Sequence, residues 1–113
     1  MIKQKYRFHS RGGIRYTYQQ GKSIRNPKIS LIYNKNTRGY QRFAVVVSKK
    51  VLKSAVGRNR IRRRVYEAIR LELPEFTKKQ DSIFVVYDKA VKNMSFLELR
   101  EVIHLLLAES VRN

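Results

Sequence analysis

Residues 48–64 have the sequence SKKVLKSAVGRNRIRRR, and this stretch decides the fold because it joins a strand to a helix. The strand is predicted at residues 43–48, which are β-branched and apolar on both faces. The helix is predicted at residues 58–73 and is ended by Pro74. One stripe of apolar residues at helical spacing supports it: Ile61, Val65, Ala68, Ile69 and Leu73.

The start of this helix carries an unusual concentration of positive charge, with five arginines among residues 58–64. Arg58 and Arg62 are four residues apart and repel each other, and cations in a first turn oppose the helix dipole. A bound phosphate would reverse this cost, and Asn59 adds a neutral donor and acceptor. The alternative is a solvated charged face, but such faces normally mix both signs of charge.

Further elements are predicted on the N-terminal side. Turn-forming residues 34–39 separate strands at 29–33 and 43–48, which suggests that the two strands form a hairpin. Residues 14–18 fit a short helix ended by Gly21, although their aromatic residues fit a strand equally well.

On the C-terminal side, residues 82–87 form another predicted buried strand, and Ser95 with Glu98 matches the capping box of a last helix. That helix is expected to bury Leu99, Val102, Ile103 and Leu106. The sequence therefore predicts one α+β domain over residues 1–113, with a mixed sheet, two helices and loosely ordered residues 1–13.

The charge distribution indicates a polyanionic partner. The chain has 113 residues, with 26 Lys and Arg against 8 Asp and Glu, a net charge of +18. Residues 1–66 hold 19 of the basic residues and no acidic one. Nucleic acid is the commonest partner of so basic a domain, and anionic membrane is the weaker candidate.

Several classes of protein are excluded or disfavoured. The chain has no cysteine, which excludes a disulfide scaffold, a zinc ribbon and a thiol nucleophile. No apolar run approaches the length of a membrane span, and the basic N-terminus leads into no secretory signal. The chain also has no glycine-rich phosphate loop.

No set of residues predicts catalysis by the protein itself. Nuclease chemistry by side chains needs paired histidines or grouped carboxylates, and the two histidines, His9 and His104, lie far apart in the sequence. Glu101 and His104 have a spacing compatible with metal binding, but further ligands are missing, so a surface pair is the favoured interpretation. We expect no catalytic residue and no protein-bound metal.

Taken together, the motifs resemble the protein subunit of bacterial ribonuclease P. The resemblance rests on residues 48–50, 55–56 and 58–63 and on Glu67, and it covers the chain from about Ile14 onward. It implies the element order α-β-β-β-α-β-α and a left-handed β-α-β crossover, where the general rule would favour a right-handed one.

The resemblance also implies a function. The protein would be a noncatalytic cofactor for a catalytic RNA that removes the 5′ leader of precursor tRNA in the cytoplasm. The expected partners are this RNA and precursor tRNA, with no DNA and no membrane. Mg²⁺ is expected for the holoenzyme, while the protein alone binds no cofactor.

The resemblance assigns residues to two surfaces. The catalytic RNA is expected to contact Lys50, Lys53, Arg58, Asn59, Arg60, Arg62 and Arg63. The leader is expected to lie in a cleft against Ile14, Tyr18, Ser30, Ile32, Val46, Ser48 and Lys49, since single strands bind cationic grooves with apolar or aromatic platforms. Ile14 and Ile32 replace aromatic residues of the family, Arg64 replaces an apolar one and Tyr66 replaces an arginine.

Two other functions remain as alternatives. A small basic ribosomal protein would share the composition, and the spacing of Lys49-Lys50 from Arg58-Asn59-Arg60 argues against it. The identity of the RNA that copurifies would distinguish the two. A protein-only nuclease would need carboxylates in the basic half, and there are none before Glu67.

Overall fold

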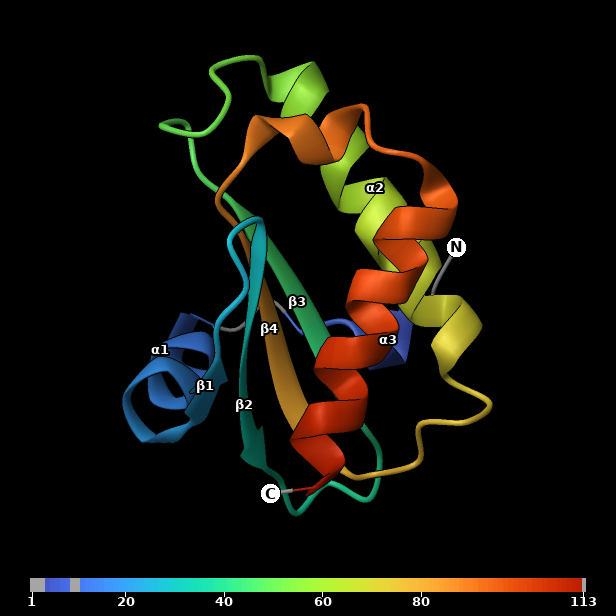
Figure 1. The fold of residues 1–113 in the computed structure, drawn as a ribbon. Helices are drawn as coiled ribbons and strands as arrows, with labels where there is room; N and C mark the ends of the chain where they lie inside the picture. Colours follow the sequence, from blue (N-terminus) through green and yellow to red (C-terminus); the bar gives the residue numbers. More distant parts are fainter. Residues whose placement is uncertain (1–3, 9–10, 113) are drawn as a thin grey trace.

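A four-stranded mixed sheet with helices on both faces forms the protein (Figure 1). The computed structural model describes residues 4–8 and 11–112. The elements are η1 (Gln4–Tyr6), α1 (Arg11–Gln20), β1 (Lys22–Ile24), β2 (Ile29–Lys35), β3 (Arg42–Val47), α2 (Ala55–Glu72), β4 (Gln80–Val86), η2 (Lys89–Lys92) and α3 (Phe96–Arg112). This confirms the predicted α+β class and the order α-β-β-β-α-β-α, and it settles residues 14–18 as helix.

The strand order is β1-β2-β4-β3, so the predicted hairpin between β2 and β3 is wrong. β4 lies between them, antiparallel to β2 and parallel to β3. Every residue of β4 except Val85 is buried, so this strand needs cover on both faces and a partner on each edge. β3, α2 and β4 thus form a β-α-β unit, and the left-handed crossover stays a prediction from the resemblance.

The main core lies between the sheet and the pair α2 and α3, which pack against each other. The predicted apolar stripes are confirmed, with Leu73 and Val102 only half-buried. Serine caps position both helices: Ser54 Oγ accepts the Gly57 N–H at 3.0 Å, and Ser95 Oγ accepts the Glu98 N–H at 3.1 Å. None of the helices in the described ranges meets the length and hydropathy needed to cross a membrane.

The described part of the N-terminal segment is packed, contrary to the expectation for residues 1–13. Arg7 forms a parallel bridge with Phe43, and the Phe8 N–H donates to the Phe43 carbonyl at 3.0 Å. Phe8 is only 3% exposed. The segment therefore protects the free edge of β3 and covers part of the sheet face opposite α2 and α3. His9 lies outside the described residues.

Candidate nucleic-acid interface

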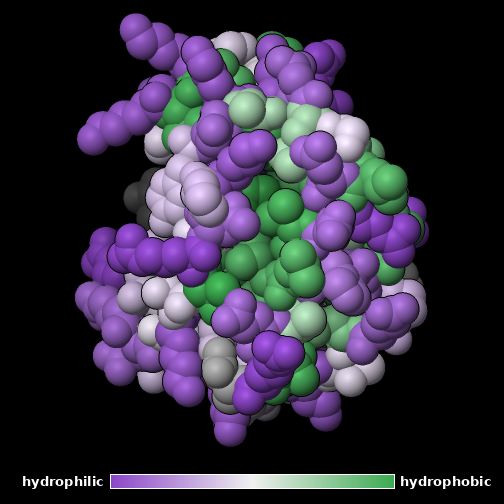
Figure 2. Space-filling model, viewed as in Figure 1, coloured by the Kyte–Doolittle hydropathy of each residue, from purple (hydrophilic) through white to green (hydrophobic). Residues whose placement is uncertain are grey.

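The sheet face that α2 and α3 leave free is partly covered by α1 and by Phe8. Because side chains alternate along a strand, Ile32 of β2, Ala44 and Val46 of β3, and Ile83 of β4 share this face and form a second apolar cluster. We call it the cleft face. In the view of Figure 2, which has α3 in front as in Figure 1, another apolar area is surrounded by hydrophilic side chains.

A cavity of about 550 Å³ lies where the cleft face meets the first turns of α2. Its apolar wall includes Phe8, Ile14, Val46 and Tyr66. Its polar wall consists of Arg7, Asn59, Arg62 and Arg63. Residues predicted for two separate surfaces, one for the catalytic RNA and one for the leader, therefore meet at a single cavity.

Two residues of this cavity were missed or misread in the sequence. Arg7 was placed in a loose tail, yet its guanidinium carbon lies 5.7 Å from the centre of the Tyr66 ring. Its Nε is buried and has no hydrogen-bond partner within the described part of the chain. Tyr66 is 7% exposed, and burial raises the pKa of its phenol. A cation and an aromatic ring thus lie together inside the cavity. The only hint of this in the sequence was that Tyr66 replaces an arginine of the family.

The arginines of α2 do not all remain available to a ligand. Arg58 donates to the carbonyls of Leu52 at 2.9 Å and Lys53 at 2.7 Å, so it fastens the loop between β3 and α2. Arg62 donates to the side-chain oxygen of Asn59. Arg58 therefore holds the loop before α2 in place, and its contact with the catalytic RNA stays a prediction.

The other residues predicted for the catalytic RNA lie at the surface. The exposed ones are Lys50, Lys53, Asn59, Arg60 and Arg63. The loop between β3 and α2 projects at the top of Figure 1, and long hydrophilic side chains extend outward there in Figure 2. This end of the molecule offers a dense array of cations to a polyanion.

Arg64 takes no part in that array. Its guanidinium donates to the carbonyls of Val91 at 2.6 Å and Lys92 at 2.9 Å, and also to that of Met94. These carbonyls belong to η2 and the turn after it. Arg64 therefore ties α2 to the segment that leads into α3, and its guanidinium is held by carbonyls of the protein.

The predicted leader residues differ in how much surface they offer. Tyr18 is 43% exposed. Its partial burial is the main cause that raises the pKa of its phenol, and the nearby Tyr87 is the second. Ser48 and Lys49 are exposed at the end of β3. Ser30 lies on the cleft face but is only 3% exposed, and its hydroxyl donates to the Asn26 carbonyl at 3.5 Å. It therefore has little capacity left for a ligand.

His104 pairs across α2 and α3 rather than with Glu101. Its Nδ1 lies 2.5 Å from Oε1 of Glu72, a carboxylate that also receives Arg100 at 3.5 Å. The predicted surface pair is thus replaced by a contact between helices. Glu72, Glu75 and His104 form the one group of three metal-ligand side chains found in the described ranges, and it lies away from the cleft face.

Fold and site together describe a small α+β protein with a cavity whose cationic and apolar walls suit a nucleic acid. A family model described as Ribonuclease P matches residues 2–110. The chain belongs to the ribonuclease P protein family.

Individual relatives agree with this assignment. The chain is 34% identical over 109 residues to the ribonuclease P protein component of Chloroflexus aurantiacus, covering 96% of this chain and 80% of the relative. It is 38% identical over 91 residues to that of a Thermoanaerobacter species, covering 80% and 72%.

Solved structures have the same fold. The ribonuclease P protein from Thermotoga maritima has a TM-score of 0.79 at 26% identity, with 90% of this chain and 96% of that chain covered. The protein from Staphylococcus aureus has a TM-score of 0.80 at 24% identity, with 93% and 94% covered. These relatives support the ribonuclease P interpretation and not the ribosomal alternative.

Membership in the family gives the activity in general terms. The chain is a protein component of ribonuclease P, the ribonucleoprotein endonuclease that processes the 5′ end of tRNA. It associates with the RNA subunit and with the tRNA substrate, and hydrolysis by the RNA is consistent with the family.

Proposed function

We propose that the cavity between α2 and the cleft face holds the 5′ leader of precursor tRNA next to the site of cleavage. The observation that carries this proposal is the meeting of Arg62 and Arg63 with Ile14 and Val46 around one cavity. A single strand needs cations for its phosphates and apolar or aromatic surface for its bases, and both are present.

The unpaired donor of Arg7 supports the same proposal. A buried N–H group without a partner is costly, and a phosphate or base oxygen in the cavity would satisfy it. The pairing of Arg7 with the Tyr66 ring keeps the guanidinium directed along the cavity wall. Ile14 on α1 would contact the bases from the opposite wall, and Tyr18, which shares a neighbouring pocket with Ile14, would extend that surface along α1.

The catalytic RNA is proposed to contact the outer side of the same helix and the loop before it. Lys50, Lys53, Arg60 and Arg63 are exposed there, and Arg58 acts indirectly by holding the loop. Arg63 both lines the cavity and faces outward, so it would lie where leader and catalytic RNA approach each other.

We further propose that the holoenzyme needs Mg²⁺ and that the RNA, not this chain, holds it. Apart from the amide of Asn59, the described residues around the cavity are cationic or aromatic and aliphatic, and none of them is a carboxylate that would hold a hard cation. The expected partners do not include DNA or membrane. The proposed location is the cytoplasm, the compartment of the precursor RNAs that the protein would bind.

The test is the affinity of the assembled holoenzyme for precursor tRNA relative to mature tRNA. Arg7→Ala and Val46→Ala remove one polar and one apolar contact of the cavity. Both should weaken binding of the precursor and leave mature tRNA unaffected, because only the precursor carries a leader. Equal weakening of both ligands, or no change in either, would contradict the proposal.

A further inference from the structure

A second pocket lies at the other end of the cleft face, where β2 ends and β3 begins. It has a volume of about 520 Å³. Tyr16 of α1, Lys35 and Arg38 beside the β2–β3 turn, and Arg42 with Asp81 of the sheet line it. We call it the loop-end pocket. The family resemblance did not assign any of these residues to a surface.

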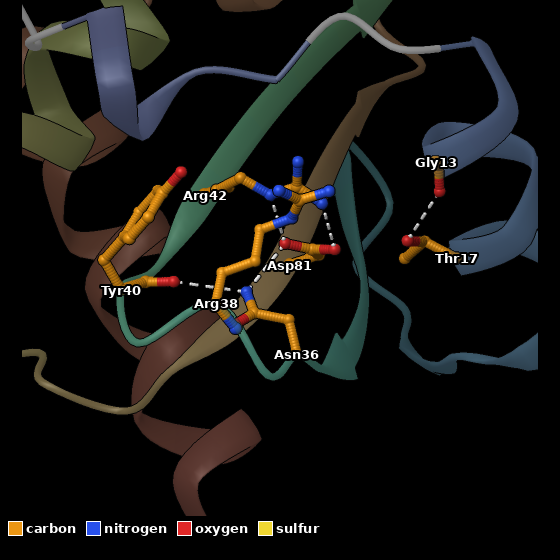
Figure 3. Close-up of polar contacts among 7 residues, drawn as sticks. All are labelled: Gly13, Thr17, Asn36, Arg38, Tyr40, Arg42 and Asp81. Atoms are coloured by element: carbon orange, nitrogen blue, oxygen red, sulfur yellow. Dashed lines mark hydrogen bonds and ion pairs between the residues drawn. The ribbon is translucent and has the colours of Figure 1, made fainter.

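The polar side chains on the floor of the loop-end pocket form hydrogen bonds with one another. Arg42 holds the Asp81 carboxylate with two hydrogen bonds, of 2.8 and 2.7 Å, and Asn36 Nδ2 donates to it at 2.8 Å (Figure 3). Hydrogen bonding to Asp81 raises the pKa of Arg42. Arg42 also lies over the Phe8 ring, 4.7 Å from its centre. The one carboxylate of the pocket is therefore neutralised.

Two cations remain at the rim. The side chains of Lys35 and Arg38 are exposed, and within the described part of the chain neither has a hydrogen bond or an ion pair. With Arg42 matched to Asp81, these two give the pocket a net charge of +2. Such a rim attracts an anion and offers it no competing carboxylate.

The turn that carries these cations is held in one conformation. Asn36 donates to the Tyr40 carbonyl at 3.2 Å and accepts the Arg38 N–H at 3.0 Å (Figure 3). Gly39 has a φ of 84°, which favours glycine. The cations are thus presented by an ordered turn, and an ordered site loses less entropy on binding.

An aromatic platform completes the pocket. Tyr16 lies on α1, which also provides Ile14 to the cavity at the α2 end, and it is 60% exposed. An exposed ring beside two unpaired cations is the combination that binds a base together with its phosphates. α1 thus presents a ring or an apolar side chain toward each end of the cleft face.

We propose that the loop-end pocket binds leader nucleotides far from the cleavage site, with Tyr16 stacking on a base and Lys35 and Arg38 contacting phosphates. This rests on the proposed function, in which the nucleotides nearest the cleavage site lie at the α2 end. On β3 the loop-end pocket is lined by Arg42 and the cavity at the α2 end is centred on Val45, so the two sites lie three residues apart, or about 10 Å at about 3.3 Å per residue. A short leader fills only the first pocket, whereas a longer leader reaches the second.

The test measures the affinity of the holoenzyme for precursors with leaders of about two, five and ten nucleotides, because single-strand sites in other folds cover roughly 4–16 nucleotides. For the longest leader, Tyr16→Ala should weaken binding about 5- to 150-fold. The double variant Lys35→Ala/Arg38→Ala should make the slope of log K against log salt shallower by about 1.4, two contacts at about 0.7 each. Neither variant should affect the shortest leader.

A matched control removes two exposed cations elsewhere, Lys89→Ala/Arg112→Ala, and should not depend on leader length. If the wild type gains affinity with the first nucleotides and the loop-end variants match it at every length, this inference is overturned and the proposed function stands. An equal loss for mature tRNA also overturns it. If no leader of any length improves wild-type binding, the proposed function itself fails.

Discussion

Arg63 and Arg64 are neighbours in the sequence, but their side chains serve different parts of the molecule. Arg63 is exposed and lines the cavity, whereas Arg64 is half-buried and donates to carbonyls after β4. The sequence could not separate them, because an arginine beside an apolar stripe can extend to solvent or reach back to a carbonyl. Only the placement of η2 against α2 decides which occurs.

This difference predicts that replacing each arginine by methionine affects a different property, stability at position 64 and RNA binding at position 63. Arg64→Met should lower the free energy of unfolding by about 1.5–3 kcal/mol, because charged hydrogen bonds to η2 are lost. Arg63→Met should change stability little and weaken binding of the catalytic RNA. Urea denaturation and RNA titration of both variants provide the measurement. A stable Arg64→Met protein with weakened RNA binding would contradict the assignment.

Tyr18 provides a second prediction for a single residue. Tyr18→Ala should weaken binding of precursor tRNA to the holoenzyme about 5- to 150-fold, because one base loses its stacking partner. Mature tRNA should bind as before. Tyr18→Phe keeps the ring and is the control. Since Tyr18 is 43% exposed, a melting curve must accompany the titration. Parallel loss of stability and of affinity for both ligands would make Tyr18 a core residue.

The elements show what the sequence could predict and what it could not. Helical spacing predicted α2 and α3, and the cap at Ser95 predicted the start of α3, because both signals are local. The cap at Ser54 was missed, so the predicted start of α2 was three residues late. The turn at residues 34–39 predicted a chain reversal but not the partner strand. The turn connects β2 to β3 across two strand spacings, roughly 10 Å, because β4 lies between these strands at a buried, central position of the sheet. Strand partners depend on burial of whole faces, which no local pattern encodes.

The first turns of α2 predict a salt dependence. Arg60→Ala/Arg63→Ala should flatten the slope of log K against log salt for the catalytic RNA by roughly 1.4–1.8, two contacts at about 0.7–0.9 each. Arg58→Ala should behave differently, because it frees the loop carbonyls of Leu52 and Lys53. We expect it to lower stability as well as affinity. The slopes and melting temperatures of the three proteins are the measurement.

At the scale of the whole molecule, the basic residues of the N-terminal half do not all lie on one surface. Residues before Glu67 form α1, the three first strands and the arginine end of α2, so their charge surrounds the cleft face. The sequence predicted the residue types of the site from charge and resemblance. It could not predict the convergence of Arg7, Tyr66 and Arg62, because these residues meet only through the packing of the N-terminal segment on β3.

The whole molecule also determines what the purified protein can do alone. The described residues around the cavity offer cations, an amide and apolar groups, none of which suits general acid–base or metal-assisted hydrolysis at neutral pH. The protein by itself should therefore leave precursor tRNA intact. Adding the catalytic RNA should give cleavage, and the protein should help most at low Mg²⁺, because its Lys and Arg replace counterions of the RNA. A cleavage assay over a range of Mg²⁺ concentrations tests this, and cleavage by RNA-free protein would refute the cofactor role.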